Sequence, residues 1–266
     1  MLEIKNLTKI FNKDMAVADR KVALDNLSLK INEGDFVTII GGNGSGKSTL
    51  MNMICGVYEP DEGTVIIDDK DVTHEKEYKR AKYLGRVFQD PMMGTCSNMS
   101  ILENLELAIR RGDKRTLKWG FTKENEKLFI ELLEGLDLGL EKRLNQKVGL
   151  LSGGQRQAVT LIMATLKRPK LLLLDEHTAA LDPKTAASVL NLTNKVVEEN
   201  KLTTLMITHN MRDAIRYGNR LIMLDAGKVV VDIYGEEKKN LTIEDLLKKF
   251  DQNSDIQLDD KLILSK

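Results

Sequence analysis

The sequence predicts an α/β fold, and three observations predict it. Short apolar runs alternate with amphipathic stretches along the chain, as in folds that place helices against a sheet. An unbroken apolar run, FVTII at 36–40, enters a loop that holds four glycines, and a helical pattern follows it. A second apolar run, LLLL at 171–174, ends in two acidic residues. The helical pattern between these runs predicts a mainly helical segment inserted into the α/β core.

The predicted elements follow in chain order. Strands are expected at 2–7, 27–31, 36–40, 64–67, 84–89, 171–174, 204–208, 220–224 and 229–233. Helices are expected from 48 to a stop at Gly56, over much of 100–168, and at 242–250, before a tail of unassigned role. Ser100 and Glu103 have the spacing of a capping box, which marks a helix start. Asp225–Lys228 is expected to turn the last two strands into a hairpin.

Composition excludes several classes of protein. In 266 residues, Lys plus Arg (40) equals Asp plus Glu (40), which argues against a protein that mainly grips nucleic acid. Cys55 and Cys96 have no metal-binding or disulfide spacing, so we expect buried or half-buried thiols. No run approaches the roughly 18 apolar residues of a membrane span, and the N-terminus has charges where a signal peptide is apolar. We therefore expect a cytosolic chain that reaches a membrane only through a partner.

The loop GGNGSGKST at 41–49 has the composition of a phosphate cradle. Glycines let the backbone N–H groups approach phosphate oxygens, and the N-terminus of the next helix adds partial positive charge. Lys47 is predicted to reach the β- and γ-phosphates of a nucleotide, and the Ser48 hydroxyl to bind Mg²⁺. The complete set of predicted loop contacts is Gly41, Gly42, Asn43, Gly44, Ser45, Gly46, Lys47, Ser48 and Thr49.

The two acids of LLLLDE lie at the carboxyl end of a buried strand, where open α/β sheets place their ligands. Asp175 is predicted to bind Mg²⁺ through water. Glu176 is predicted to act on the attacking water, as a general base or as its electrostatic positioner.

The stretch LSGGQRQ at 151–157 predicts a second anion-binding helix start. Ser152 and Gln155 have capping-box spacing, and Gly153 and Gly154 lie between them. The glycine loop already covers one face of a triphosphate. A second such surface is therefore explained if two copies of the chain face each other and enclose the ATP.

Together these motifs resemble the ATPase subunit of ATP-binding cassette (ABC) transporters, from the N-terminus to about residue 235. The family's motifs occur in its order: the Walker A loop (41–48), the Q-loop glutamine (Gln89), the signature LSGGQ (151–155), the Walker B strand (171–176), the D-loop AALD (179–182) and the switch histidine (His209). The resemblance implies a P-loop NTPase domain with a RecA-like core, an N-terminal antiparallel β subdomain and a helical subdomain at about 98–168. Residues 236–266 would add a C-terminal helix and tail.

The resemblance also assigns roles. Gln89 would sense Mg²⁺ and the γ-phosphate, Asp182 would lie at the dimer seam, and His209 would contact the γ-phosphate. Phe11 is the best match to the aromatic residue that stacks on adenine, although it has no phenolic hydroxyl. His177 stands where the family commonly has proline, which alters the rigidity of this turn without removing a reactive group.

The resemblance implies that a homodimer drives a separate membrane permease, at the cytoplasmic face. The contact is expected at 90–105, where Met92, Met93 and Met99 suit an adaptable groove. The stretches 100–108 and 175–183 are similar to amino-acid importer ATPases, including a group associated with aromatic amino acids. Such importers act with an extracytoplasmic substrate-binding protein. An exporter ATPase, a soluble cassette protein acting on ribosomes or DNA, and a regulatory nucleotide binder are the alternatives.

Overall fold

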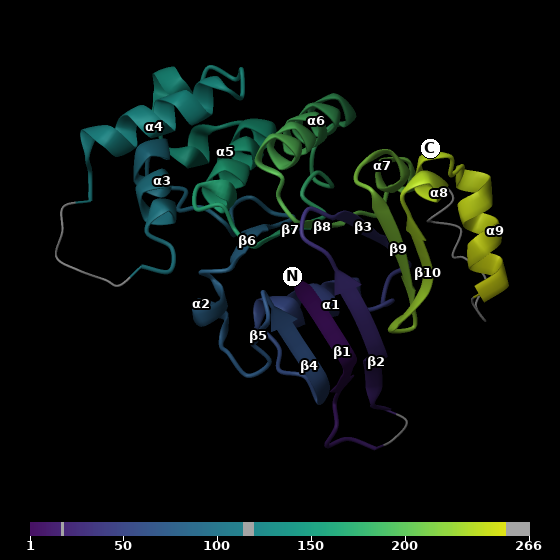
Figure 1. Cartoon of the computed structure of the whole chain (residues 1–266). Coiled ribbons are helices and arrows are strands. Elements are labelled where there is room, and N and C mark those ends of the chain that lie inside the picture. Colours follow the sequence, from purple (N-terminus) through teal and green to yellow (C-terminus); the bar gives the residue numbers. More distant parts are fainter. Residues whose placement is uncertain (17–18, 114–119, 254–266) are drawn as a thin grey trace. The chain divides into compact units, whose positions relative to one another are not determined.

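The computed structural model describes residues 1–16, 19–113 and 120–253 (Figure 1). The chain forms two compact units, each described by itself below. The first comprises Met1–Arg80 and the described chain from Leu202 on, and the second comprises Ala81–Lys201. Part of the loop 12–21 and most of the tail 251–266 lie outside the described residues. The subdomain predicted at about 98–168 falls within the second unit, and its boundaries stay a prediction.

An antiparallel sheet occupies the N-terminal part of the first unit. Its strands are β1 (Leu2–Phe11), β2 (Lys21–Ile31), β4 (Glu62–Ile67) and β5 (Lys70–Asp71), in the order β2-β1-β4-β5. β1 and β2 are longer than predicted, and both strands are irregular. Asn6 and Asn26 have φ values of 49° and 51°, and the β1–β2 register shifts between Ile4 and Ile10. These irregularities break the alternation of apolar residues that marks a strand in a sequence.

A second set of strands in this unit holds the glycine loop. β3 (Phe36–Ile40) is buried throughout and is parallel to both β8 (Thr204–Ile207) and β9 (Arg220–Asp225). A central parallel strand is covered on both faces, which explains the continuous apolar run FVTII. β10 (Lys228–Tyr234) pairs antiparallel to β9 through the predicted hairpin, whose Ala226 and Gly227 both have positive φ.

The helices of the first unit include α1 (Lys47–Cys55), α2 (Glu77–Arg80), α7 (Met211–Arg216), α8 (Glu236–Lys239) and α9 (Ile243–Asn253). α1 ends where predicted, at Gly56, which is left-handed and donates its N–H to carbonyls of the last turn. Thr242 and Asp245 exchange hydrogen bonds at the start of α9, the helix predicted at 242–250. Leu246 and Phe250 of α9 are buried in one cluster with Ile40 and Met223.

The second unit pairs two parallel strands and contains most of the helical chain. β6 (Leu84–Val87) lies beside β7 (Leu171–Asp175). The helices are α3 (Ile101–Ile109), α4 (Lys123–Glu134), α5 (Gly153–Thr165) and α6 (Pro183–Asn200), with short 3₁₀ helices η2 (Glu141–Arg143) and η3 (Val148–Leu150). Both predicted capping boxes are present, at Ser100 and Ser152. The sequence pattern predicts no helix at α6, because Thr, Ser and Asn interrupt the apolar periodicity there.

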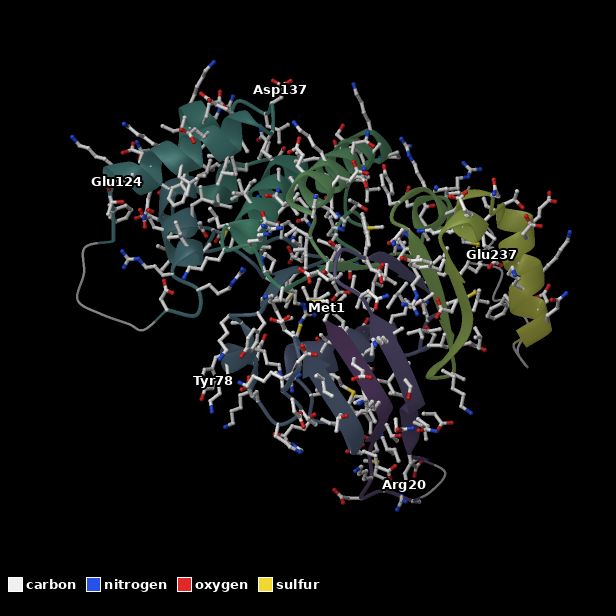
Figure 2. The ribbon with its side chains drawn as sticks, viewed as in Figure 1. Met1, Arg20, Tyr78, Glu124, Asp137 and Glu237 are labelled. Carbon is white, nitrogen blue, oxygen red and sulfur yellow. The ribbon has the colours of Figure 1, made fainter. Side chains whose placement is uncertain are left out.

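Side chains on the surface of each unit are mostly polar, and a few apolar ones project outward. Figure 2 labels Tyr78, which is 70% exposed, and Glu124 in the first turn of α4. Cys55 is buried as expected, but Cys96 is exposed, so the expectation for this thiol was wrong. Cys96 lies in an irregular segment after β6. Such a segment has no periodic pattern from which the burial of its side chains can be predicted. Within the described ranges, no helix has the length and apolar character of a membrane span.

Candidate functional site

The glycine loop joins the buried strand β3 to α1. Gly46 precedes the helix with φ of 103°, and no side chain caps the helix start. A Cβ on Gly41 would overlap the carbonyl oxygen of Leu224, so this position tolerates only glycine. The first turn of α1 contains no acidic residue. No negative side chain from that turn offsets the partial positive charge at the N-terminus of α1, and this end of the helix therefore favours an anionic ligand.

Lys47 is folded back onto the loop that precedes it. Its side chain is largely buried, at 7% exposure, and Nζ donates to the carbonyl oxygens of Gly41 (2.8 Å) and Gly42 (2.9 Å). These bonds hold the ammonium within the loop. Ser48, by contrast, is exposed, so its hydroxyl can reach a ligand.

Phe11 ends strand β1 and is partly exposed. Its ring meets that of Tyr58 edge to face, with centroids 5.4 Å apart and planes at 80°. Lys9 Nζ lies 5.7 Å from the centroid of the Phe11 ring. Tyr58 therefore packs against Phe11 in the T-shaped arrangement that aromatic pairs favour, and it helps to hold the Phe11 ring in place.

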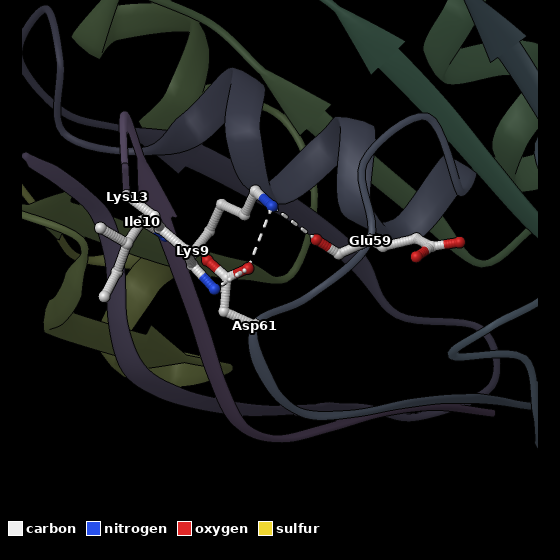
Figure 3. A network of polar contacts seen from close by, with 5 residues as sticks. All are labelled: Lys9, Ile10, Lys13, Glu59 and Asp61. Carbon is white, nitrogen blue, oxygen red and sulfur yellow. Dashed lines mark hydrogen bonds and ion pairs between the residues drawn. The ribbon is translucent and has the colours of Figure 1, made fainter. Parts of the chain in front are cut away.

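The end of β1 is held by Asp61, which the sequence analysis did not single out (Figure 3). Its carboxylate accepts from the Ile10 N–H (2.6 Å) and from Lys9 Nζ (3.3 Å), and it pairs with Lys13 Nζ (2.7 Å). Lys9 also donates to the Glu59 carbonyl (2.8 Å). Although burial alone would raise the pKa of Asp61, these bonds hold that pKa below its usual value. The network fixes the strand end that carries the aromatic residue.

His209 belongs to the same unit as the glycine loop. It is exposed, two residues after β8, and the next residue, Asn210, caps α7 through its side chain. His209 acts electrostatically on the carboxyl of Asp213, whose pKa is raised by burial. An exposed imidazole at a strand end can donate a hydrogen bond to a phosphate oxygen.

In the second unit, β7 ends in Asp175 and Glu176. The Asp175 carboxylate accepts a hydrogen bond from Arg86 (3.0 Å), and only 17% of the Asp175 side chain is exposed. Glu176 is held with φ of 43°, a left-handed conformation that is uncommon for this residue type. Such backbone strain concentrates at ligand-binding and catalytic positions, because the surrounding structure must enforce it.

The turn after Glu176 is tied down by buried polar groups. Gln157, from α5, is fully buried and donates to the carbonyls of His177 (2.6 Å) and Phe88 (3.0 Å). His177 is 3% exposed, and its Nε2 lies 3.1 Å from Thr193 Oγ1. The His177 ring therefore contacts α6 instead of solvent. The sequence pattern did not identify Gln157 and Arg86 as structurally important. Each is a polar residue within an apolar stretch, and that was the signal that could have indicated a buried polar side chain.

The LSGGQ stretch starts α5 with a capping box. Gln155 N–H donates to Ser152 Oγ (3.3 Å), and Ser152 N–H donates to Gln155 Oε1 (3.2 Å). Asp182 caps the neighbouring α6 by accepting from the Thr185 N–H (3.1 Å), and hydrogen bonds from Thr185 lower the pKa of this carboxyl. Ser152 and Gly153 are exposed. The start of α5 therefore presents backbone donors and an uncharged surface to a ligand.

Gly154 permits the starts of α5 and α6 to touch. A Cβ at this position would overlap the Thr185 methyl group. We expect Gly154→Ala to lower the free energy of unfolding by about 1–3 kcal/mol through overpacking. Thr185→Ser removes that methyl and retains the backbone N–H that caps α6, so the double variant should recover most of the loss. Urea unfolding of the two single variants and the double variant measures this, and equal stability of Gly154→Ala and the double variant would contradict it.

The predicted site residues divide between the units. Phe11, the 41–49 loop and His209 belong to the first unit; Gln89, the 152–155 stretch, Asp175, Glu176 and Asp182 belong to the second. Each unit contributes oxygen donors of the kind that Mg²⁺ prefers: the first has the exposed Ser48 hydroxyl, and the second has the Asp175 carboxylate and the Gln89 amide oxygen. Asp175 already accepts a cationic group in the structure. Within the described chain, no cluster of three acidic, His or Cys side chains forms a complete metal cage.

Comparisons with known proteins agree with these features. Residues 24–179 match the family model described as ABC transporter. A tyrosine transport ATP-binding protein of Clostridioides difficile is 50% identical over 251 residues, covering 94% of this chain and 99% of that protein. A methionine import ATP-binding protein of Clostridium tetani is 36% identical, covering 93% of this chain and 76% of that protein.

Solved structures show the same fold. The dimeric post-hydrolysis state of the ATP-binding cassette MJ0796 of Methanocaldococcus jannaschii, bound to ADP and Pi, superposes with a TM-score of 0.74 at 34% identity. The match covers 88% of this chain and 98% of that chain. The predicted P-loop NTPase fold and ATP as the ligand are thereby confirmed. The chain belongs to the ABC transporter family and is one of its ATP-binding, ATP-hydrolysing cassettes.

Proposed function

We propose that this chain powers the import of an amino acid, of the aromatic class, through a separate membrane permease. The observation that carries the proposal is the 50% identity to a tyrosine transport ATP-binding protein over 94% of this chain. That identity includes nearly the whole length of the relative, so it is not confined to the nucleotide-binding motifs. The chain would act at the cytoplasmic face of the membrane, bound to the permease, and an extracytoplasmic binding protein would deliver the cargo. No nucleic acid takes part.

The proposed chemistry is the attack of water on the γ-phosphate of ATP. Lys47 would leave the Gly41 and Gly42 carbonyls to hold the β- and γ-phosphates. Glu176 would accept the proton of the attacking water, and the exposed His209 would donate to the γ-phosphate. Mg²⁺, held by Ser48, Asp175 and Gln89, would neutralise charge on the phosphates when bound.

The proposed working unit is a homodimer with ATP enclosed between two copies. The capped, exposed start of α5 at Ser152–Gln155 supports this, because it is an anion-binding helix start separate from the glycine loop in the chain. The cassette MJ0796, at 34% identity, forms a dimer in its ADP- and Pi-bound state. Asp182, which caps α6 close to this stretch, would lie at the seam. ATP binding would close the dimer, and loss of the products would open it.

The proposed permease contact is a groove of about 440 Å³ in the second unit. Met93, Leu107 and Met163 line it, and Met93 and Leu107 are 70% and 53% exposed. Of the three methionines in the predicted contact, Met93 is the one that lines this groove. Flexible thioether side chains suit a partner helix that moves during the cycle.

Transport in cells tests this function. Deletion of the gene for this chain should abolish the high-affinity uptake of radiolabelled tyrosine or another aromatic amino acid, and should leave methionine uptake intact. Expression of the unmodified chain should restore uptake, whereas the Glu176→Gln variant should not. Loss of efflux from preloaded cells, with uptake unchanged, would instead establish an exporter and contradict the proposal.

Phe11 provides a test of nucleotide recognition. Stacking of a base on an aromatic ring is worth about 1–3 kcal/mol, so Phe11→Ala should weaken ATP binding roughly 5- to 150-fold. Inorganic triphosphate has no base and should bind the variant and the unmodified chain equally. Phe11→Tyr retains the ring and serves as the control. Calorimetric titration measures all three, and a parallel loss of triphosphate binding would show that Phe11 acts on the fold and not on adenine.

A further inference from the structure

Arg86 occupies a position that the proposed reaction does not use. It lies in β6, where its backbone is paired with Leu173 of the parallel strand β7. Side chains alternate between the faces of a sheet, so Arg86, Leu173 and Asp175 project from one face. Two residues of a strand span about 7 Å, a distance that an arginine side chain can bridge. The Arg86–Asp175 contact is therefore built into the strand register.

The pair is held in a sheltered environment. Only 14% of the Arg86 side chain and 17% of the Asp175 side chain are exposed, and Nη2 of Arg86 lies 3.0 Å from Oδ2 of Asp175. The guanidinium also stacks over the Phe88 ring, 4.5 Å from its centroid. Its buried Nε has no hydrogen-bond partner among the described residues. The group is positioned by Phe88 and by Asp175, and part of its donor capacity is unused.

The position of this ion pair has a consequence for metal binding. Asp175 is the carboxylate to which the proposed function assigns Mg²⁺, and the Arg86 guanidinium neutralises it in the structure. A divalent cation that approaches Asp175 must compete with this fixed positive charge. Arg86 also lines the groove that contains Phe88 and Met93, so there is unfilled space beside it.

We propose that Arg86 is the counter-ion of Asp175 that a divalent cation must displace, and that it thereby sets the affinity of this cassette for its metal. This inference rests on the proposed metal-binding function of Asp175. Arg86 acts through Asp175 and is a positioning residue. Its guanidinium offsets the negative charge of the Asp175 carboxylate until nucleotide and metal arrive, and the groove beside it makes the exchange sensitive to what occupies that groove.

The test measures metal binding without turnover. The purified full-length chain is saturated with ADP, and Mn²⁺ binding is followed by the loss of the EPR signal of unbound Mn²⁺. Arg86→Met and Arg86→Gln should each tighten Mn²⁺ binding roughly tenfold, the order expected for removing a half-buried charge pair. Arg86→Lys retains the charge and should stay close to the unmodified chain.

Arg111→Met is the matched control, because Arg111 lines the same groove and donates to the Ala164 carbonyl (3.0 Å) instead of to Asp175. It should leave Mn²⁺ affinity unchanged. In an Asp175→Asn background, Arg86→Met should also have no effect, which a purely structural role for Arg86 would not predict.

Unchanged or weaker Mn²⁺ binding in both neutral Arg86 variants would overturn the proposal. Two neutral variants are used in case one of them does not fold, and thermal unfolding shows whether each variant is folded. Binding of fluorescent ADP in EDTA by the unmodified chain is measured in parallel. If the unmodified chain does not bind ADP, the proposed function itself is contradicted. If it binds ADP but the Arg86 variants have the same Mn²⁺ affinity as the unmodified chain, only the role of Arg86 is contradicted.

Discussion

Replacement of Glu176 by glutamine is expected to abolish ATP turnover while ATP still binds. Glutamine has nearly the same shape and can occupy the same strained backbone, but it cannot accept a proton from water at neutral pH. Loss of a general base lowers rates by about 10²- to 10⁴-fold. Release of phosphate from ATP by the purified chain measures the effect. The exposed Glu124→Gln, in the first turn of α4, is the control for loss of one negative charge and should hydrolyse ATP normally.

The same variant tests the enclosed-ATP dimer. Without hydrolysis, two ATP molecules should hold the copies together, so Glu176→Gln should elute as a dimer in ATP and as a monomer in ADP on size-exclusion chromatography. Unchanged hydrolysis would contradict the assignment of Glu176. Abolished hydrolysis with a monomer in ATP would retain that assignment and contradict the dimer.

His177 is expected to make the chain lose stability as the pH falls. Thr193 Oγ1 donates to the Val189 carbonyl (2.8 Å), so it accepts from the protonated Nε2 of a neutral His177. A second proton would place a charge in a buried site, and burial lowers the pKa of His177 from 6.5 to about 4. Between these two values the unfolded chain binds a proton that the folded chain does not. The free energy of unfolding therefore falls as pH falls through this window, by about 3 kcal/mol in total.

Urea unfolding at several pH values isolates this contribution. Acidic residues with lowered pKa values also destabilise the fold in acid, so the informative quantity is the difference between the unmodified chain and His177→Gln, which keeps a donor near Thr193. That difference should change by about 2 kcal/mol between pH 7 and pH 5, in favour of the variant at low pH. His74→Gln, at an exposed position, controls for the loss of an imidazole. A difference that does not vary with pH would show that His177 is protonated at little cost.

The features predicted correctly from sequence depend on neighbouring residues. FVTII, the glycine loop and the helix after it are contiguous in the chain. The apolar run forms a buried strand, the glycines give the loop its backbone freedom, and the helix starts at Lys47. The capping boxes at Ser100 and Ser152 each span four residues, and the β9–β10 hairpin depends on two. Because these structures form from short-range contacts, their patterns are visible in one sequence. The motif order was specific enough to indicate the family, which the comparisons confirm.

What only the tertiary structure decided involves residues far apart in the chain. Arg86 and Asp175 are 89 positions apart, and Asp61 reaches Ile10 across 51. Their side chains meet because β6 lies beside β7 and because β1 ends near the loop before β4, and no local pattern encodes that proximity. The same reason explains β1 and β2, whose bulges form where the two strands pair. The sequence by itself determined the phosphate loop, the helix starts and the family; strand pairing decided which charge stands against Asp175.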